Sequence, residues 1–261
     1  MLQAAHAAGV PVPEVLWLGD DPAVLDGRFF VMERIEGETL ARRLLREPAY
    51  EGARRVMTGQ LGAILARDPC RADRRSGLTA LPGMRDEGHP AALELAPLRG
   101  NLSAPRARAA SRDRVRVPLA RAASAGRAVG VCWCTATTGS ATSCSDRKGV
   151  RVVLDWEQAH VGDPMEDLGW MCVRAWRFGS PLPVGGIGER DEFFRAYERA
   201  AGDAVDPEVV RFWEAFGDLK WAVICIAQAK TYLDGGVKSL ELASIGRRTA
   251  EAEHDLLELV D

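Results

Sequence analysis

The middle of this chain differs sharply in composition from both flanks, and this limits how the rest can fold. Residues 67–148 hold 14 arginines and one lysine against seven acidic residues. The segment's net charge is therefore +8, and the rest must carry −11 to give the total of −3. It contains one aromatic residue, Trp133, and no sustained helical or strand periodicity. We expect it to be poorly ordered, with residues 1–66 and 149–261 supplying the folded parts.

A basic segment of this kind can be a linker or an arm that binds nucleic acid. It lacks the aromatic side chains on which bases stack, and no nucleic-acid-binding motif frames its arginines. We therefore expect no nucleic-acid partner.

The composition of the whole chain favours a globular protein in the cytoplasm. Hydrophobic residues make up 47% of the 261 residues, which is enough for a sizeable core. No apolar run approaches the roughly 20 residues that cross a bilayer, and the N-terminus lacks a signal-peptide pattern. We expect no membrane contact, and we expect the six cysteines to be reduced thiols.

Outside the basic segment, local patterns predict strands followed by helices, an α+β arrangement. Two strands are expected at residues 14–18 and 28–35, with turn residues between them that favour a hairpin. A third strand should end at Asp155. Pro207 suits the first turn of a long helix, and Asp206 suits its N-cap. The helices are expected at residues 38–46, 50–66, 165–176, 189–201, 207–233 and 240–259.

The run VVLDWE at residues 152–157 predicts a buried strand that ends in a carboxylate. Taken alone, Asp155 would more often cap the next turn than bind a metal, because short motifs match by chance. A hard cation such as Mg²⁺ prefers carboxylate oxygen, so the position also suits a magnesium ligand.

Several runs together resemble a known family. They are GVPVP at residues 9–13, FVMERIEG at 30–37, and LDWE at 154–157 followed by GDPMEDL at 162–168. In this order and spacing they resemble the aminoglycoside phosphotransferase and choline kinase-like family. Residues 170–179, with VGGIG at 184–188 and LKWA at 219–222, resemble the branch related to the kinase-like part of acyl-CoA dehydrogenase fusion proteins.

The resemblance implies a protein kinase-like bilobal fold with a mainly helical C-terminal lobe. It implies that Met32, Glu33, Arg34 and Ile35 form the hinge whose backbone groups bind the adenine of ATP. Asp155 would then hold Mg²⁺ on the nucleotide phosphates, and the acceptor would be a hydroxyl group of a small molecule. We assign Asp163 and Asp167 structural roles at the start of a helix, and Glu157 at most a supporting role near the metal.

The catalytic loop that the family places before this strand is missing. It reads His-Gly-Asp, then Asn after four more residues, whereas residues 132–142 read CWCTATTGSAT. The codons that can encode this stretch and the residues after it also permit another reading. When the reading frame begins one base earlier, they permit LVHGDYRIGNFLFGPEG, which contains His-Gly-Asp and the Asn at the family's spacing. Near Arg67 a different offset of the reading frame permits the residues Ile-His-Ala. These residues resemble the usual continuation of the preceding helix in the family. Our hypothesis is that residues near 68 to 148 are a frameshifted translation.

The resemblance also implies that the N-terminal lobe is incomplete, because no phosphate-binding lysine or glycine-rich loop is identifiable. We therefore predict that the written chain has no appreciable kinase activity. A non-catalytic binding module remains an alternative, with ligand contacts from its tryptophans, although tryptophans at helical spacing are more often core. Zinc binding by Cys132, Cys134 and Cys144 is disfavoured, because no complete second half of a site is present.

Overall fold

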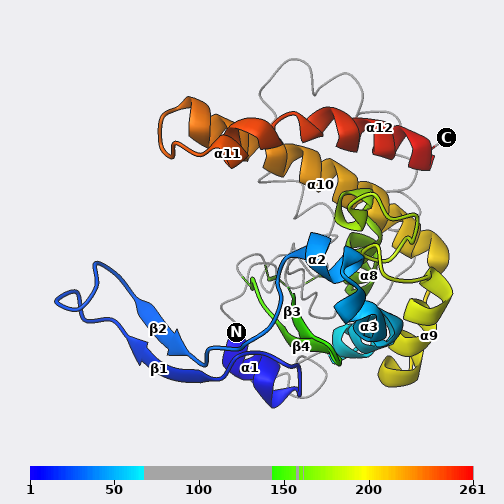
Figure 1. Cartoon of the computed structure of the whole chain (residues 1–261), viewed down its shortest axis with the longest axis horizontal. Coiled ribbons are helices and arrows are strands. Elements are labelled where there is room, and N and C mark those ends of the chain that lie inside the picture. Colours follow the sequence, from blue (N-terminus) through cyan, green and yellow to red (C-terminus); the bar gives the residue numbers. More distant parts are fainter. Residues whose placement is uncertain (68–142, 157–158, 161, 261) are drawn as a thin grey trace.

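The computed structural model describes residues 1–67, 143–156, 159–160 and 162–260 (Figure 1). Most of the basic segment therefore lies outside the described residues, as do Glu157, Cys132 and Cys134. The described elements, in chain order, are α1 (Leu2–Ala7), β1 (Val15–Gly19), β2 (Phe29–Met32), α2 (Ala41–Arg46), η1 (Pro48–Tyr50), α3 (Glu51–Leu65), β3 (Ser143–Asp146), β4 (Gly149–Val153), α8 (Pro164–Cys172), η3 (Arg174–Arg177), α9 (Arg190–Ala201), α10 (Pro207–Leu233), α11 (Leu240–Ile245) and α12 (Arg248–Val260).

The described strands form two antiparallel hairpins. In the first, β1 pairs with β2, and it extends away from the helices (Figure 1). In the second, β3 pairs with β4 and places Ser143 opposite Val153. Strand β3 lies within residues 67–148, the segment that we expected to be poorly ordered. The residues of β3 are small and polar, yet Ser143, Cys144 and Ser145 are at most 2% exposed.

Hydrogen bonds join the second hairpin to the N-terminal part of the chain. Glu38 and Ser145 exchange two backbone hydrogen bonds, of 2.7 and 3.0 Å. The Val153 amide donates to the Pro11 carbonyl at 2.8 Å. Both segments that flank the β1–β2 hairpin are thereby held against the β3–β4 hairpin.

The main core lies among α3, α8, α9 and α10. Its fully buried side chains include Met57 and Leu61 of α3, Leu168 of α8, and Phe193 of α9. Helices α3 and α9 approach closely at Gly62, where an added Cβ would lie 2.5 Å from the Phe193 carbonyl oxygen. The helical part is thus packed like a protein interior, where such contacts leave little room for larger side chains.

A second cluster of aromatic side chains lies where α10 meets η3 and α12. Trp170, Trp176 and Trp221 stack with ring centroids 5.2 and 4.8 Å apart, and none is more than 8% exposed. Trp213 is also buried, at 1% exposed. The prediction that tryptophans at helical spacing belong to the core is confirmed for these four residues.

Charged groups are also buried on α10. Glu214 is 1% exposed and pairs with Arg177 at 2.9 Å and Arg190 at 2.7 Å. One turn later, Asp218 is equally buried, and neither of its carboxylate oxygens has a hydrogen-bond partner among the described residues. The pKa of Asp218 is raised to about 8, mainly by burial and also by the nearby carboxylates of Glu214 and Asp255.

Four predicted elements end earlier than the sequence suggested or are interrupted. The strand expected at residues 28–35 ends at Met32. The expected helix at residues 165–176 breaks at Val173, whose ψ of 132° is extended, before η3 begins. The expected helix at residues 240–259 is interrupted between α11 and α12. The third strand ends at Val153, so Asp155 lies beyond it. No helix among the described residues is long and apolar enough to cross a membrane.

Candidate functional site

Asp155 is an exposed residue two positions beyond the end of β4. Its φ is +62°, a left-handed backbone conformation that residues other than glycine adopt infrequently. Such backbone strain persists only where the surroundings impose it, and it concentrates at functional sites. The Val153 hydrogen bond to Pro11 and the Trp156 indole bond to the Val153 carbonyl, 3.1 Å, hold the chain on either side of Asp155.

The predicted hinge is the segment that leaves the β1–β2 hairpin. Met32 ends β2 and is 44% exposed, and the Glu33 amide donates to the Glu14 carbonyl at 2.8 Å. Arg34 and Ile35 follow outside any helix or strand. Within the described residues their backbone groups make no hydrogen bond to another backbone group, although the Ile35 carbonyl accepts from the Cys144 thiol at 4.0 Å. Backbone donors and acceptors that are left open in this way can bind the edge of a planar base.

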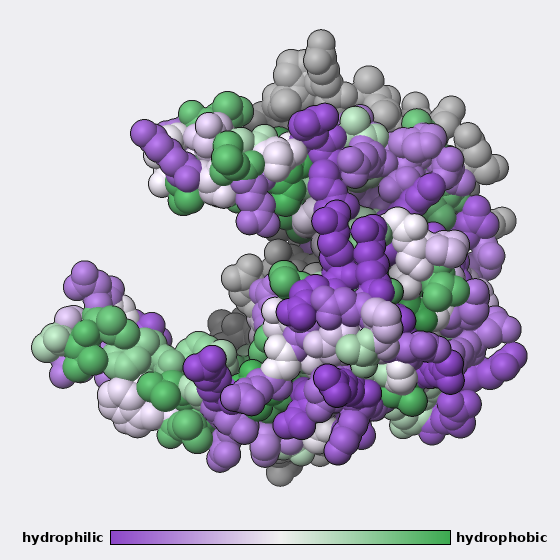
Figure 2. All heavy atoms as spheres, in the orientation of Figure 1, coloured by the Kyte–Doolittle hydropathy of each residue, from purple (hydrophilic) through white to green (hydrophobic). Residues whose placement is uncertain are grey.

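The hinge and Asp155 are attached to the same small hairpin. The hinge reaches β3 through the Glu38–Ser145 bonds, and Asp155 follows the partner strand β4. Because β3 begins opposite Val153, the N-terminal end of β3 and Asp155 lie at the same end of this hairpin. The space-filling view shows the molecule hollowed between the β1–β2 hairpin and α11 (Figure 2).

The described residues contain no group of three or more His, Cys, Asp or Glu side chains that could hold a metal ion. Mg²⁺ keeps several water ligands and often takes only one or two protein carboxylates, so an exposed Asp155 fits such a role. Cys144 is buried and free, and burial raises the pKa of its thiol, which disfavours the thiolate that zinc requires.

The helix after this loop begins as predicted. Asp163 is the N-cap of α8 and accepts a hydrogen bond from the Met165 amide at 2.9 Å. It also accepts one from the Trp213 indole at 3.2 Å. Asp167 lies in the first turn of α8 and is only 2% exposed, so it is a buried residue of this helix.

A buried group of charged or titratable side chains, which the sequence did not indicate, lies beside this loop. His160 is 5% exposed, and its Nε2 lies 3.3 Å from Glu166. The other oxygen of Glu166 lies 3.5 Å from the Lys220 ammonium. Since Lys220 is 54 residues further along the chain, no local pattern could have indicated this contact.

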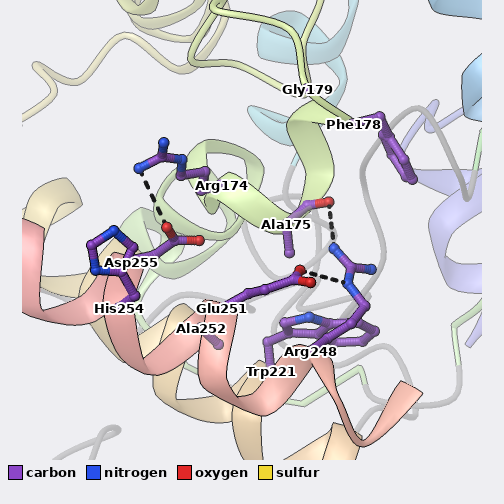
Figure 3. Close-up of a pocket in the computed structure, with 10 residues that line it drawn as sticks. All are labelled: Arg174, Ala175, Phe178, Gly179, Trp221, Arg248, Glu251, Ala252, His254 and Asp255. Carbon is purple, nitrogen blue, oxygen red and sulfur yellow. Dashed lines mark hydrogen bonds and ion pairs between the residues drawn. The ribbon is translucent and has the colours of Figure 1, made fainter. Parts of the chain in front are cut away.

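A separate cavity lies in the helical part, between η3, α10 and α12 (Figure 3). Its volume is ≈ 260 Å³. Arg174 lies on one side and pairs with Asp255, and Arg248 lies on the other, 5.3 Å from the ring of Trp221. The ring of Phe178 also lines it, and this residue has a φ of +48°.

Comparison with known proteins agrees with the geometry. A sequence model of the phosphotransferase enzyme family matches residues 1–213. A candidate aminoglycoside phosphotransferase from Ralstonia eutropha JMP134 has a similar structure, with a TM-score of 0.72 and 18% identity over 99% of this chain and 80% of its own. A choline/ethanolamine kinase family protein from Mesorhizobium loti gives a TM-score of 0.58 and 20% identity, with the same coverage.

A third similar structure is a thermostable mutant of aminoglycoside phosphotransferase APH(4)-Ia in complex with ADP and hygromycin B. Its TM-score is 0.59 and its identity 16%, over 96% of this chain and 77% of its own. No curated protein matches the sequence. At these identities the structural matches establish the fold, and they confirm the predicted α+β kinase-like architecture with a mainly helical C-terminal lobe.

Proposed function

The chain belongs to the phosphotransferase enzyme family, and from this premise we propose that its site serves the transfer of the γ-phosphoryl group of ATP to a hydroxyl group of a small molecule. The strained, exposed Asp155 beside the hinge attachment carries the proposal. Bound ADP in one similar structure supports a nucleotide as the donor.

Each part of the site has a defined role in this proposal. Backbone groups of Met32, Glu33, Arg34 and Ile35 bind the adenine edge. Among the described residues, those of Arg34 and Ile35 form no hydrogen bond to another backbone group. Asp155 holds Mg²⁺, which neutralises charge that develops on the transferred phosphoryl group. The acceptor is a small hydroxylated compound, and the small molecule hygromycin B bound in the complex named above supports this class of ligand. We also propose, from residues 170–179, that the chain is related to the kinase-like part of acyl-CoA dehydrogenase fusion proteins.

The chain as written lacks the His-Gly-Asp catalytic loop that would complete this site. We attribute the loss of this loop to a frameshift. One structural observation supports it: β3 is a buried strand, yet three of its positions are filled by Ser143, Cys144 and Ser145. Buried strand positions ordinarily carry large apolar side chains. In the alternative reading, the three codons after Asn overlap residues 142–145 and permit Phe-Leu-Phe, which suits them. Positioning and electrostatics dominate phosphoryl transfer, so a chain without the loop should be inactive.

Two measurements test the proposal. Resequencing of the gene should show nucleotides that encode His-Gly-Asp in the alternative frame, and their absence would refute the frameshift. The written chain and a chain with the restored frame should then be incubated with magnesium-ATP and a panel of hydroxyl compounds. Product is expected only from the restored chain, and at a low rate because the phosphate-binding lysine and glycine-rich loop are also missing. Its Asp155→Asn variant should lose this product. If the restored chain and its Asp155→Asn variant were equally active, Asp155 would not be part of the site.

The cavity beside α12 favours a second candidate function, ligand binding without catalysis. The buried Trp221 lines it together with Arg174 and Arg248, whose guanidinium groups can donate hydrogen bonds to a ligand. A fragment screen by NMR on the written chain should then find binders whose signals disappear in Trp221→Phe. Binders that are retained by this variant would place the ligand elsewhere, and a screen without binders would count against this function.

A further inference from the structure

Three charged or titratable side chains form a buried chain of contacts next to the Asp155 loop. Lys220 of α10, Glu166 of α8 and His160 of the loop are 6%, 2% and 5% exposed. Glu166 lies between the other two, with one oxygen 3.5 Å from the Lys220 ammonium and the other 3.3 Å from the His160 Nε2. The contacts therefore connect a helix of the C-terminal lobe to the loop that follows Asp155.

A second contact joins the same helix to the same loop. Trp213 and Lys220 are seven residues apart on α10, two helical turns, and so lie on one face. Trp213 donates to Asp163, at the end of the loop, while Lys220 reaches His160 through Glu166. Helix α10 thus contacts the loop at two points.

The close packing of α8 against α10 makes this connection rigid. A Cβ on Gly169 of α8 would lie 2.5 Å from the Cβ of Trp213, and one on Gly217 of α10 would lie 2.5 Å from a methyl carbon of Val173. The two helices therefore cannot move closer together. The Lys220 ammonium also lies 5.8 Å from the centre of the Trp170 ring, a distance at which the ring attracts a cation.

Burial of these charges is a poor way to gain stability. Desolvation of an ion pair often offsets its attraction, and an apolar pair of the same size is frequently as stable. What such a network does provide is a fixed geometry, because each member is satisfied in only one arrangement.

We propose that His160, Glu166 and Lys220 are positioning residues that hold the loop after Asp155, and with it the Asp155 carboxylate, in the orientation that binds the metal-nucleotide complex. This inference rests on the proposed function of Asp155. Groups that orient metal ligands from the next layer typically change metal affinity by about 10- to 100-fold when they are removed.

The test compares Lys220→Met with Lys230→Met in the full chain. Lys230 is on the same helix, but its side chain is 68% exposed and pairs with Asp234, which is also exposed. Amide hydrogen exchange without metal would report on residues 155–163, and electron paramagnetic resonance would measure the affinity for Mn²⁺ with ADP. We expect Lys220→Met to speed exchange in this loop, to weaken Mn²⁺ binding about 10-fold, and to leave the affinity for metal-free ADP unchanged. Lys220→Arg should restore much of both properties.

His160→Gln provides a second variant should Lys220→Met fail to fold, since it removes the loop end of the network. Loop exchange in the Lys220 or His160 variant that matches Lys230→Met would overturn the inference. Faster exchange, combined with Mn²⁺ binding that Asp155→Asn does not alter, would support the network and refute the proposed metal ligand instead. A uniform rise in exchange through α3 and α9 would show general loss of stability, and would also overturn the positioning role.

Discussion

The buried carboxyl group of Asp218 should make the stability of the protein fall as pH rises. The pKa of Asp218 is raised from 3.8 to about 8, mainly by burial. Below pH 3.8 the carboxyl is protonated in both the folded and unfolded states. Between these two values the unfolded chain is ionised while the folded chain must keep its proton. Folding then becomes less favourable by about 1.4 kcal/mol per pH unit, and the loss levels off above the folded pKa.

Asp218→Asn removes this titration and keeps the shape of the neutral acid. Between pH 5 and pH 7.5, the free energy of unfolding of the variant minus that of the natural chain should rise by about 3 kcal/mol. Urea unfolding followed by tryptophan fluorescence at both pH values would measure it. The difference is needed because burial also raises the pKa of Glu214 and Asp255, which remain in both proteins.

Asp191→Asn is the matched control, since the Asp191 side chain is 81% exposed on α9. It should change the free energy of unfolding by less than about 1 kcal/mol at either pH. If the difference between Asp218→Asn and the natural chain were the same at pH 5 and pH 7.5, Asp218 would be ionised in the folded protein, and the reasoning from its burial would be wrong.

Four further substitutions test the helical lobe by urea unfolding. Glu214→Ala leaves two arginines without their buried partner and should cost about 3–5 kcal/mol; a loss below 1 kcal/mol would mean that water reaches the site. Gly62→Ala forces a Cβ against the Phe193 carbonyl and should cost about 2 kcal/mol. Gly59→Ala, in the same helix with its nearest contact at 3.8 Å, should instead stabilise by up to about 1 kcal/mol, so equal effects would contradict the contact. Asp206→Ala should cost about 1 kcal/mol as a lost N-cap, and no loss would show that the cap is dispensable.

Local chemistry was sufficient to predict the long helix of the C-terminal lobe. The predicted and observed helix both span Pro207–Leu233, and Asp206 accepts hydrogen bonds from the amides of Glu208 and Val209. The helix ends just before Gly235, whose φ is +80°. Caps and glycines act within one turn of their own position, so a sequence displays them directly.

Breaks imposed by neighbouring helices could not be predicted in this way. Val173 lies against Gly217 of α10, and the chain turns there so that Val173 and Trp176 are both buried beside that helix. Helix α11 ends at Gly246, where an added Cβ would lie 2.8 Å from the Cβ of Ala229 on α10. Helical periodicity continues through both positions, because it records which face is apolar and not how closely another helix approaches.

The β3–β4 hairpin shows the same limit at the candidate site. The apolar run at residues 152–154 predicted β4, but nothing in Ser143, Cys144 or Ser145 predicts a strand, since serine has little preference for one. Pairing with β4 and the two backbone bonds from Glu38 nevertheless hold β3 in place. Strand β3 thus forms despite its own side chains, in a segment that we expected to be poorly ordered. Residues 149–153 and the hinge supply the partners for β3, and a Phe-Leu-Phe sequence there would favour the same strand through its own side chains.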